Sequence, residues 1–144
     1  MRFEKRATTS ATPERAFAYL SDLTRHPEWS SHGLKIAQSS PGAVAVGTTF
    51  TTEAHQFGKQ NDAVTITELE PGRRIAFETS GKAGVVRHWF EVGSAAHGAT
   101  ITKGMEFVKM SAASKIASPG IRLNVPRALT KDLDRIKTRL ESAG

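Results

Sequence analysis

The chain of 144 residues is 38% hydrophobic and 24% charged, a composition typical of one soluble globular domain, which we place at residues 1–144. It contains no cysteine, which excludes disulfides, thiolate metal sites and a cysteine nucleophile. The net charge is +6, and residues 103–144, with nine Lys/Arg and four Asp/Glu, carry +5 of it. The amino terminus has no apolar signal core and no stretch reaches about 18 apolar residues, so we expect a cytoplasmic protein without a membrane span.

The first elements expected are a strand and two short helices. Residues 3–10 are rich in threonine and are compatible with a strand. Thr12-Pro13-Glu14 is typical of a helix start, with a hydroxyl N-cap, proline at the first helical position and an acid in the first turn. Residues 23–29 predict a second short helix or turn. Pro27 disfavours the α conformation at His26, so the helix is expected to break there.

From Leu34 onward the pattern changes to strands joined by turns. Residues 64–67 alternate between apolar and threonine side chains, which is the period of a strand with one buried face. Turn residues separate the strands at Phe57-Gly58-Lys59, Glu70-Pro71-Gly72 and Gly93–Gly98. The order predicts a meandering antiparallel sheet. Its main strands are expected at Gly47–Phe57, Ala63–Leu69, Arg74–Thr79, Val85–Val92 and Thr100–Val108.

The segment Lys109–Gly120 is rich in serine and alanine and is expected to be a long irregular connection. An enclosed binding site needs a movable part, and this segment is well placed to supply one. We therefore hypothesise that Met110 and Ile116 form part of a lid.

A long helix is predicted from Pro119 to Leu140. Its apolar residues follow one another at spacings of four, four, three and four, which places them on one stripe. Burying five such side chains contributes about 10 kcal/mol before entropy is subtracted. The charged residues between them, including Asp132 and Asp134, are expected on the solvated side. A stripe of this size needs a large apolar partner, so we expect this helix to pack on the sheet. The stripe consists of Val125, Leu129, Leu133, Ile136 and Leu140.

The order of strand, two short helices, several strands and long helix resembles the SRPBCC superfamily, which includes START-type, pollen-allergen-type and polyketide cyclase/dehydrase-like proteins. The resemblance implies an α+β helix-grip fold, with a curved antiparallel sheet of about six or seven strands around a long C-terminal helix. It covers nearly the whole chain. The matching residues are Ala11–Asp22, His26-Pro27-Glu28-Trp29, Val46-Gly47-Thr48, Glu70–Phe77 and Leu133–Lys137.

The resemblance also implies an elongated, mostly apolar cavity between the sheet and the C-terminal helix. One helix cannot fill a wide curved sheet, which agrees with that expectation. Leu23 and Trp29 are expected near the entrance, and the same-face residues of strands and helix as walls. The predicted cavity residues are Leu23, Trp29, Phe50, Val64, Ile66, Ile75, Phe77, Phe90, Ile101, Met105, Phe107, Val125, Leu129 and Leu133.

Lys103 is the first weak catalytic candidate, because it shares a strand face with Ile101, Met105 and Phe107. Family members usually look apolar at this position. A lysine there could meet an acidic ligand group or, when desolvated, act as a base. Alternatively, a bulge at Gly104 turns Lys103 outward, or its side chain extends to the sheet edge.

His88 is the second weak candidate, since a histidine inside the grip could bond a ligand carbonyl or act as a general acid or base. The alternative is a wall residue without a catalytic role. His88 shares one face with Val86, Phe90 and Val92, and Trp89 lies on the other. The sequence leaves open which face of this strand is inside.

Three functions stay open. The first is binding of a hydrophobic small molecule, such as a lipid, polyketide or isoprenoid. The second is a polyketide cyclase/dehydrase-like enzyme that uses the same cavity, and the third is an interaction module that uses the basic C-terminal helix. We expect no cofactor, no metal site and no nucleic-acid partner, because the corresponding motifs and interleaved aromatic residues are missing. The chain is expected to be a monomer or a homodimer.

Overall fold

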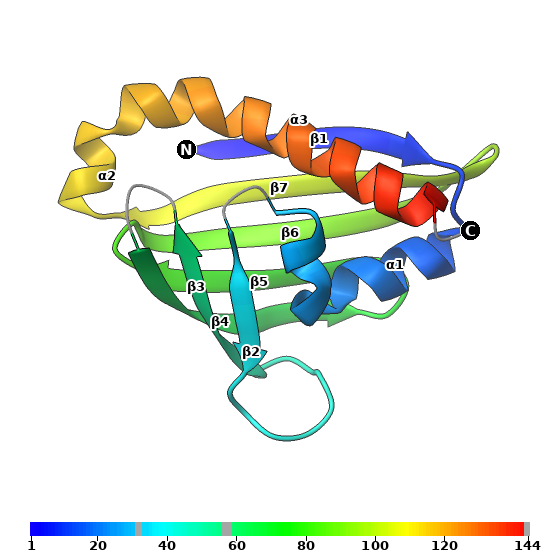
Figure 1. The fold of residues 1–144 in the computed structure, drawn as a ribbon, viewed down its shortest axis with the longest axis horizontal. Coiled ribbons are helices and arrows are strands. Elements are labelled where there is room, and N and C mark those ends of the chain that lie inside the picture. The colour runs from blue at the N-terminus through cyan, green and yellow to red at the C-terminus, as the bar shows by residue number, and fades with distance from the viewer. Residues whose placement is uncertain (31–32, 56–58, 143–144) are drawn as a thin grey trace.

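Seven antiparallel strands form one sheet in the order β1-β7-β6-β5-β4-β3-β2, and a long helix lies along one face of it (Figure 1). The computed structural model describes residues 1–30, 33–55 and 59–142. The strands are β1 (Arg2–Thr9), β2 (Lys35–Gln38), β3 (Thr49–His55), β4 (Lys59–Glu70), β5 (Arg74–Gly81), β6 (Gly84–Ala95) and β7 (Gly98–Met110). The helices are α1 (Pro13–Ser21), the 3-10 helix η1 (Leu23–Glu28), α2 (Ala112–Ile116) and α3 (Ser118–Ser142). The predicted α+β helix-grip fold is confirmed.

The two short helices follow β1 as predicted, and each begins at a polar N-cap. The Thr12 hydroxyl accepts a hydrogen bond from the Arg15 backbone N–H at 3.2 Å, with Pro13 at the first helical position. The Asp22 carboxylate accepts one from the Thr24 N–H at 3.1 Å and starts η1. These caps fix α1 and η1 at one end of the grip, where their apolar side chains join the core.

Helix α3 buries most of the predicted apolar stripe, with two corrections. Leu129, Leu133, Ile136 and Leu140 are buried, while Val125 is only half-buried. Asp132 is also buried, at 7% exposure, although it was expected on the solvated side. Its position three residues after Leu129 and four before Ile136 places it within the stripe, and the site below supplies the cation that makes its burial possible.

The connection expected to be irregular between residues 109 and 120 is ordered, so that prediction is wrong. Strand β7 continues to Met110, and Ser111 then caps α2 by accepting a hydrogen bond from the Ser114 N–H at 3.1 Å. The Ser114 hydroxyl in turn donates to the Ala83 carbonyl at 2.9 Å. Ile116 is 84% exposed, so it does not cover the inner face as the lid hypothesis requires.

The strands are longer than the sequence suggested. Gly93 and Ser94 lie within β6 and Gly98 begins β7, so the predicted turn at residues 93–98 shrinks to its centre. The register also shifts between Val85 and Val86, where β7 carries an extra residue opposite them. This bulge lies beyond Lys103, so Lys103 keeps its place on the inner face. Residues 57 and 58 of the predicted hairpin connection lie outside the described residues.

Candidate functional site

Lys103 lies inside the grip, in the middle of β7. In the sheet register it stands opposite Phe90 of β6 on one side and Lys5 of β1 on the other. It is only 6% exposed, and its Nζ lies 3.7 Å from Oδ2 of Asp132 on α3. Both alternatives that would have placed Lys103 outside are therefore wrong. A buried ammonium is tolerated when a carboxylate accompanies it, so Lys103 and Asp132 explain each other's position.

Two aromatic rings complete the surroundings of the Lys103 ammonium. Its Nζ is 5.3 Å from the ring centroid of Trp29 and 5.5 Å from that of Phe90, within the range of cation–π attraction. Burial lowers the pKa of Lys103, and the Asp132 carboxylate offsets part of that effect. The Trp29 indole Nε1 is buried and has no hydrogen-bond partner within the described part of the chain. This region therefore holds a desolvated cation and a free N–H donor.

His26 packs against the same aromatic group from η1. It is 3% exposed, its ring centroid is 4.8 Å from that of Trp29, and its Nε2 is 2.9 Å from the Leu20 carbonyl oxygen. The carbonyl is only an acceptor, so Nε2 carries the proton and donates it. Burial lowers the pKa of His26 to about 4, and the Lys103 ammonium contributes in the same direction. His26 is neutral at pH 7 and holds η1 against α1.

The neutral state of His26 makes the fold sensitive to acid. Between pH 6.5 and about 4 the unfolded chain protonates this imidazole and the folded chain does not, so stability falls as the pH falls. The shift corresponds to a loss of the order of 3 kcal/mol in unfolding free energy. We expect His26→Gln to lose correspondingly less between pH 7 and 4, measured by urea denaturation at both pH values. Equal losses in the two proteins would show that His26 does not titrate in this way.

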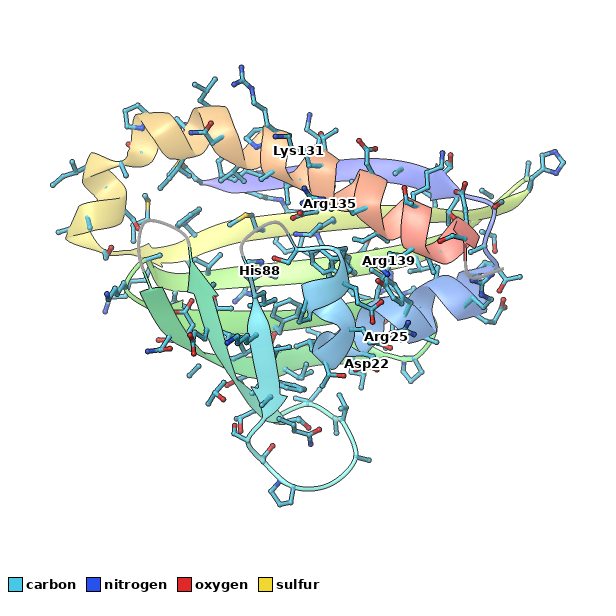
Figure 2. The ribbon with its side chains drawn as sticks, viewed as in Figure 1. Asp22, Arg25, His88, Lys131, Arg135 and Arg139 are labelled. Carbon is cyan, nitrogen blue, oxygen red and sulfur yellow. The ribbon has the colours of Figure 1, made fainter. Side chains whose placement is uncertain are left out.

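His88 lies on the inner face, which answers the question that the sequence left open. It shares that face with Phe90 and Val92, both members of the buried core. Its ring stacks on Phe77 with centroids 5.1 Å apart and an interplanar angle of 15°. Burial, and then the charge of Lys103, lower the pKa of His88, so this half-buried imidazole is also neutral at pH 7. Figure 2 shows His88 over the strands, away from the basic residues along α3.

Most side chains predicted to line a cavity instead pack against one another. Ten of the fourteen belong to one buried core, and Leu129 is buried as well. Leu23 and Trp29, expected at the entrance, are buried with 1% and 5% exposure. The remaining three, Met105, Phe107 and Val125, are half-buried like His88. The inner face is therefore closed near α1 and η1 and partly open toward the start of α3. The ten core residues are Leu23, Trp29, Phe50, Val64, Ile66, Ile75, Phe77, Phe90, Ile101 and Leu133.

The sequence corresponds to a known family. A sequence model of the family described as "Polyketide cyclase / dehydrase and lipid transport" matches residues 1–141. The chain belongs to this family. Among curated proteins none matches the sequence significantly. Membership implies a hydrophobic ligand-binding or cyclase role, and it places the chain in the SRPBCC superfamily inferred from the sequence.

Solved structures of family-like proteins agree with the fold at low sequence identity. The protein TTHA0849 from Thermus thermophilus has a TM-score of 0.80 at 12% identity, covering 100% of this chain and 99% of its own. CV1439 from Chromobacterium violaceum has a TM-score of 0.73 at 18% identity, covering 96% of each chain. The di-domain ARO/CYC StfQ from the steffimycin biosynthetic pathway has a TM-score of 0.73 at 13% identity. In that comparison 99% of this chain covers 51% of StfQ.

The family resemblance did not identify Asp132, or the indole N–H of Trp29, as part of a buried polar group. Asp132 was expected on the solvated side of the helix, and Trp29 was expected near the entrance of the cavity. The sequence did hold a signal for the position of Asp132, since Leu129, Asp132 and Ile136 follow helical spacing and so share one face of the helix. Within the described residues, no group of three or more His, Asp or Glu side chains is placed to hold a metal ion. Nor does any described helix have the length and hydropathy needed to cross a bilayer.

A groove lies on the surface of the protein, outside the grip, between α1, η1 and the end of α3. It has a volume of about 420 Å³ and a lining that includes Tyr19, Arg25 and Arg139, and Figure 2 shows the two arginines on its opposite sides. Glu28 neutralises part of the groove: Arg25 Nε donates to it at 3.1 Å and the Tyr19 hydroxyl at 3.2 Å. Burial, and then the negative charge of Glu28, raise the pKa of Tyr19 to about 12. These internal pairs already engage several of the polar groups that line the groove.

Proposed function

We propose that this family member binds a small, mostly apolar molecule that carries one acidic oxygen, with the oxygen directed to Lys103. The observation that carries the proposal is the buried Lys103–Asp132 pair within an aromatic surround. A desolvated ammonium interacts strongly with an anion because little water screens it. The ammonium has three N–H donors and its ion pair with Asp132 is long at 3.7 Å, so donor capacity remains for a ligand oxygen.

The half-open part of the inner face supports a place for the apolar body of the ligand. His88 and Met105 are register partners one row from Lys103, and Phe107 lies one row further along β7. Val125 of α3 is half-buried as well. Apolar side chains with few polar groups are the usual lining of small-molecule sites. The Trp29 indole N–H offers the ligand a second donor from the side of the core.

The test compares a fluorescent polyene fatty acid with its methyl ester, which has the same apolar chain without the negative charge. We expect the acid to bind at least about tenfold more tightly than the ester, because a hydrogen bond between two charged groups contributes that much to the affinity. The double variant Lys103→Met/Asp132→Leu should abolish this preference while the ester still binds. Lys5→Met is the matched control, since Lys5 is the exposed register partner of Lys103 and should not matter. Equal affinity for acid and ester in the unmodified protein would contradict the proposal.

A cyclase/dehydrase-like enzyme is the second candidate, and the position of His88 favours it. A neutral imidazole one row from a buried ammonium can take a proton from a carbon next to a carbonyl while the ammonium stabilises the enolate oxygen. Incubation with a synthetic poly-β-ketone thioester would then yield a product lighter by one water molecule, detected by mass spectrometry. His88→Asn should remove this conversion and preserve probe binding. A probe recovered unchanged from the unmodified protein would exclude this candidate and leave the binding role.

A further inference from the structure

A stretch of 25 residues from Phe107 to Lys131 contains no aspartate and no glutamate. It runs from the end of β7 through α2 into the first half of α3. All of its charged side chains are cations, and all of them are exposed. Such a region presents a uniformly positive surface that no neighbouring carboxylate of the same stretch neutralises. The five cations are Lys109, Lys115, Arg122, Arg127 and Lys131.

The same stretch carries the most exposed large aliphatic side chain of the described residues. Ile116 at the end of α2 is 84% exposed, and Leu123 in the second turn of α3 is 56% exposed. Val108, before α2, is 47% exposed. These three side chains lie outside the buried core, within the same acid-free stretch. Exposed apolar residues rimmed by charge mark interaction surfaces.

Ile116 ends α2 and Leu123 lies in α3, and the two helices are joined at Ala117. The Ala117 N–H donates to the Ala113 carbonyl at 2.9 Å and the Ile121 N–H to the Ala117 carbonyl at 3.0 Å, so helical hydrogen bonding passes from α2 into α3. The two side chains are seven residues apart in the sequence, on either side of the turn at Ala117. Figure 1 shows α2 at one end of the long axis of the molecule, away from the C-terminal end of α3. Helix α2 and the start of α3 therefore lie at an end of the protein that a flat surface can reach.

We infer that α2 and the first turns of α3 dock on an anionic lipid membrane. Ile116 and Leu123 enter the headgroup region, and Lys115 and Arg122, each next to one of them in sequence, contact lipid phosphates. Aliphatic residues flanked by cations without carboxylates are the pattern of interfacial membrane-binding elements. An acidic protein would complement the charges but leave the aliphatic residues in water unless it also offered a pocket. A nucleic acid would leave them without any role. The inference goes beyond the proposed ligand site and does not depend on it.

The experiment is sedimentation of the full chain with phosphatidylcholine vesicles, with and without phosphatidylserine as a minor component. We expect binding only when phosphatidylserine is present, and weaker binding at higher salt. Ile116→Ser/Leu123→Ser should lower the vesicle affinity about tenfold or more through lost apolar insertion. Lys115→Glu/Arg122→Glu should lower it at least as much through lost attraction. All four positions are exposed, so these variants are expected to fold.

The matched control is Arg6→Glu/Lys137→Glu, which makes the same change in net charge at exposed positions outside the 107–131 stretch. It should retain most of the vesicle binding. If the protein does not bind phosphatidylserine vesicles, the inference is overturned. It is also overturned if the control variant loses as much vesicle binding as Lys115→Glu/Arg122→Glu, because attraction would then depend on net charge alone. Binding that survives Ile116→Ser/Leu123→Ser unchanged also overturns it. Tighter binding to polyglutamate than to vesicles would assign the surface to an acidic protein instead.

Discussion

Replacing Lys103 alone with methionine is expected to lower the free energy of unfolding by about 3–5 kcal/mol. The substitution keeps most of the apolar length of the side chain but removes the ammonium that lies 3.7 Å from the buried Asp132 carboxylate. Asp132→Leu should be similarly costly, because it leaves the ammonium between Trp29 and Phe90 without a counter-charge. Urea denaturation at pH 7, followed by circular dichroism, measures both effects.

The double variant Lys103→Met/Asp132→Leu separates a coupled pair from two independent losses. Because no charge then remains buried, it should recover most of the stability lost in either single variant. Lys5→Met should change stability by less than about 0.5 kcal/mol, since Lys5 is exposed. Strictly additive losses in the double variant would mean that the two groups do not interact. A stable double variant without ligand preference would show that the pair is kept for binding and is not needed for the fold.

The second large effect is expected on the opposite face of the sheet, at Gly104. Trp89 is 2% exposed there, and a Cβ added at Gly104 would overlap its indole ring. Gly104→Ala therefore forces the ring out of its place, at a cost of about 3 kcal/mol. The displaced ring also loses the hydrogen bond from its Nε1 to Glu4 at 3.0 Å and its cation–π contact with Arg2 at 4.5 Å. Tryptophan fluorescence and urea denaturation measure the displacement and its cost.

Two variants test whether Trp89 is the cause. Gly93→Ala is the matched control on the neighbouring strand β6, because a Cβ at Gly93 meets nothing within 4 Å. It should change stability by less than about 0.5 kcal/mol. In a Trp89→Ala background, Gly104→Ala should cost little more, since the ring that it overlaps is gone. A full additional cost in that background would place the strain in the backbone of β7 and not in the indole.

Much of the fold was predictable because its signals are periodic and local. The apolar spacing from Leu129 to Leu140 determines α3, and Thr12-Pro13-Glu14 determines the start of α1. The connection at residues 109–120 was not predicted, since serine and alanine are compatible with both loop and helix. Two hydrogen bonds favour the helical conformation in this segment. One is the cap by Ser111 within the segment, and the other joins Ser114 to Ala83 on a distant turn.

The site was less predictable, because it depends on contacts between distant segments. Lys103 could be singled out as a polar residue in an apolar strand pattern, yet its orientation depended on whether the strand bulged at Gly104. Asp132 was assigned to solvent because its burial is stable only with Lys103 across the interior, a pairing that no local pattern reveals. The orientation of His88 was also not predictable, because alternation identifies the two faces of a strand but not which face meets the helix.

The sheet order has a consequence for how the chain reaches its native state. Neighbouring strands are consecutive in the chain except for β1 and β7, whose partners Thr9 and Ala99 are separated by 90 residues. On the ribosome, β2 to β6 can pair as each hairpin emerges, whereas β1 must wait for β7. Helix α3, which packs on β1, follows last of all. Closing this long loop is the entropically costly step of folding, so the first strand to be synthesised is among the last to find its partner.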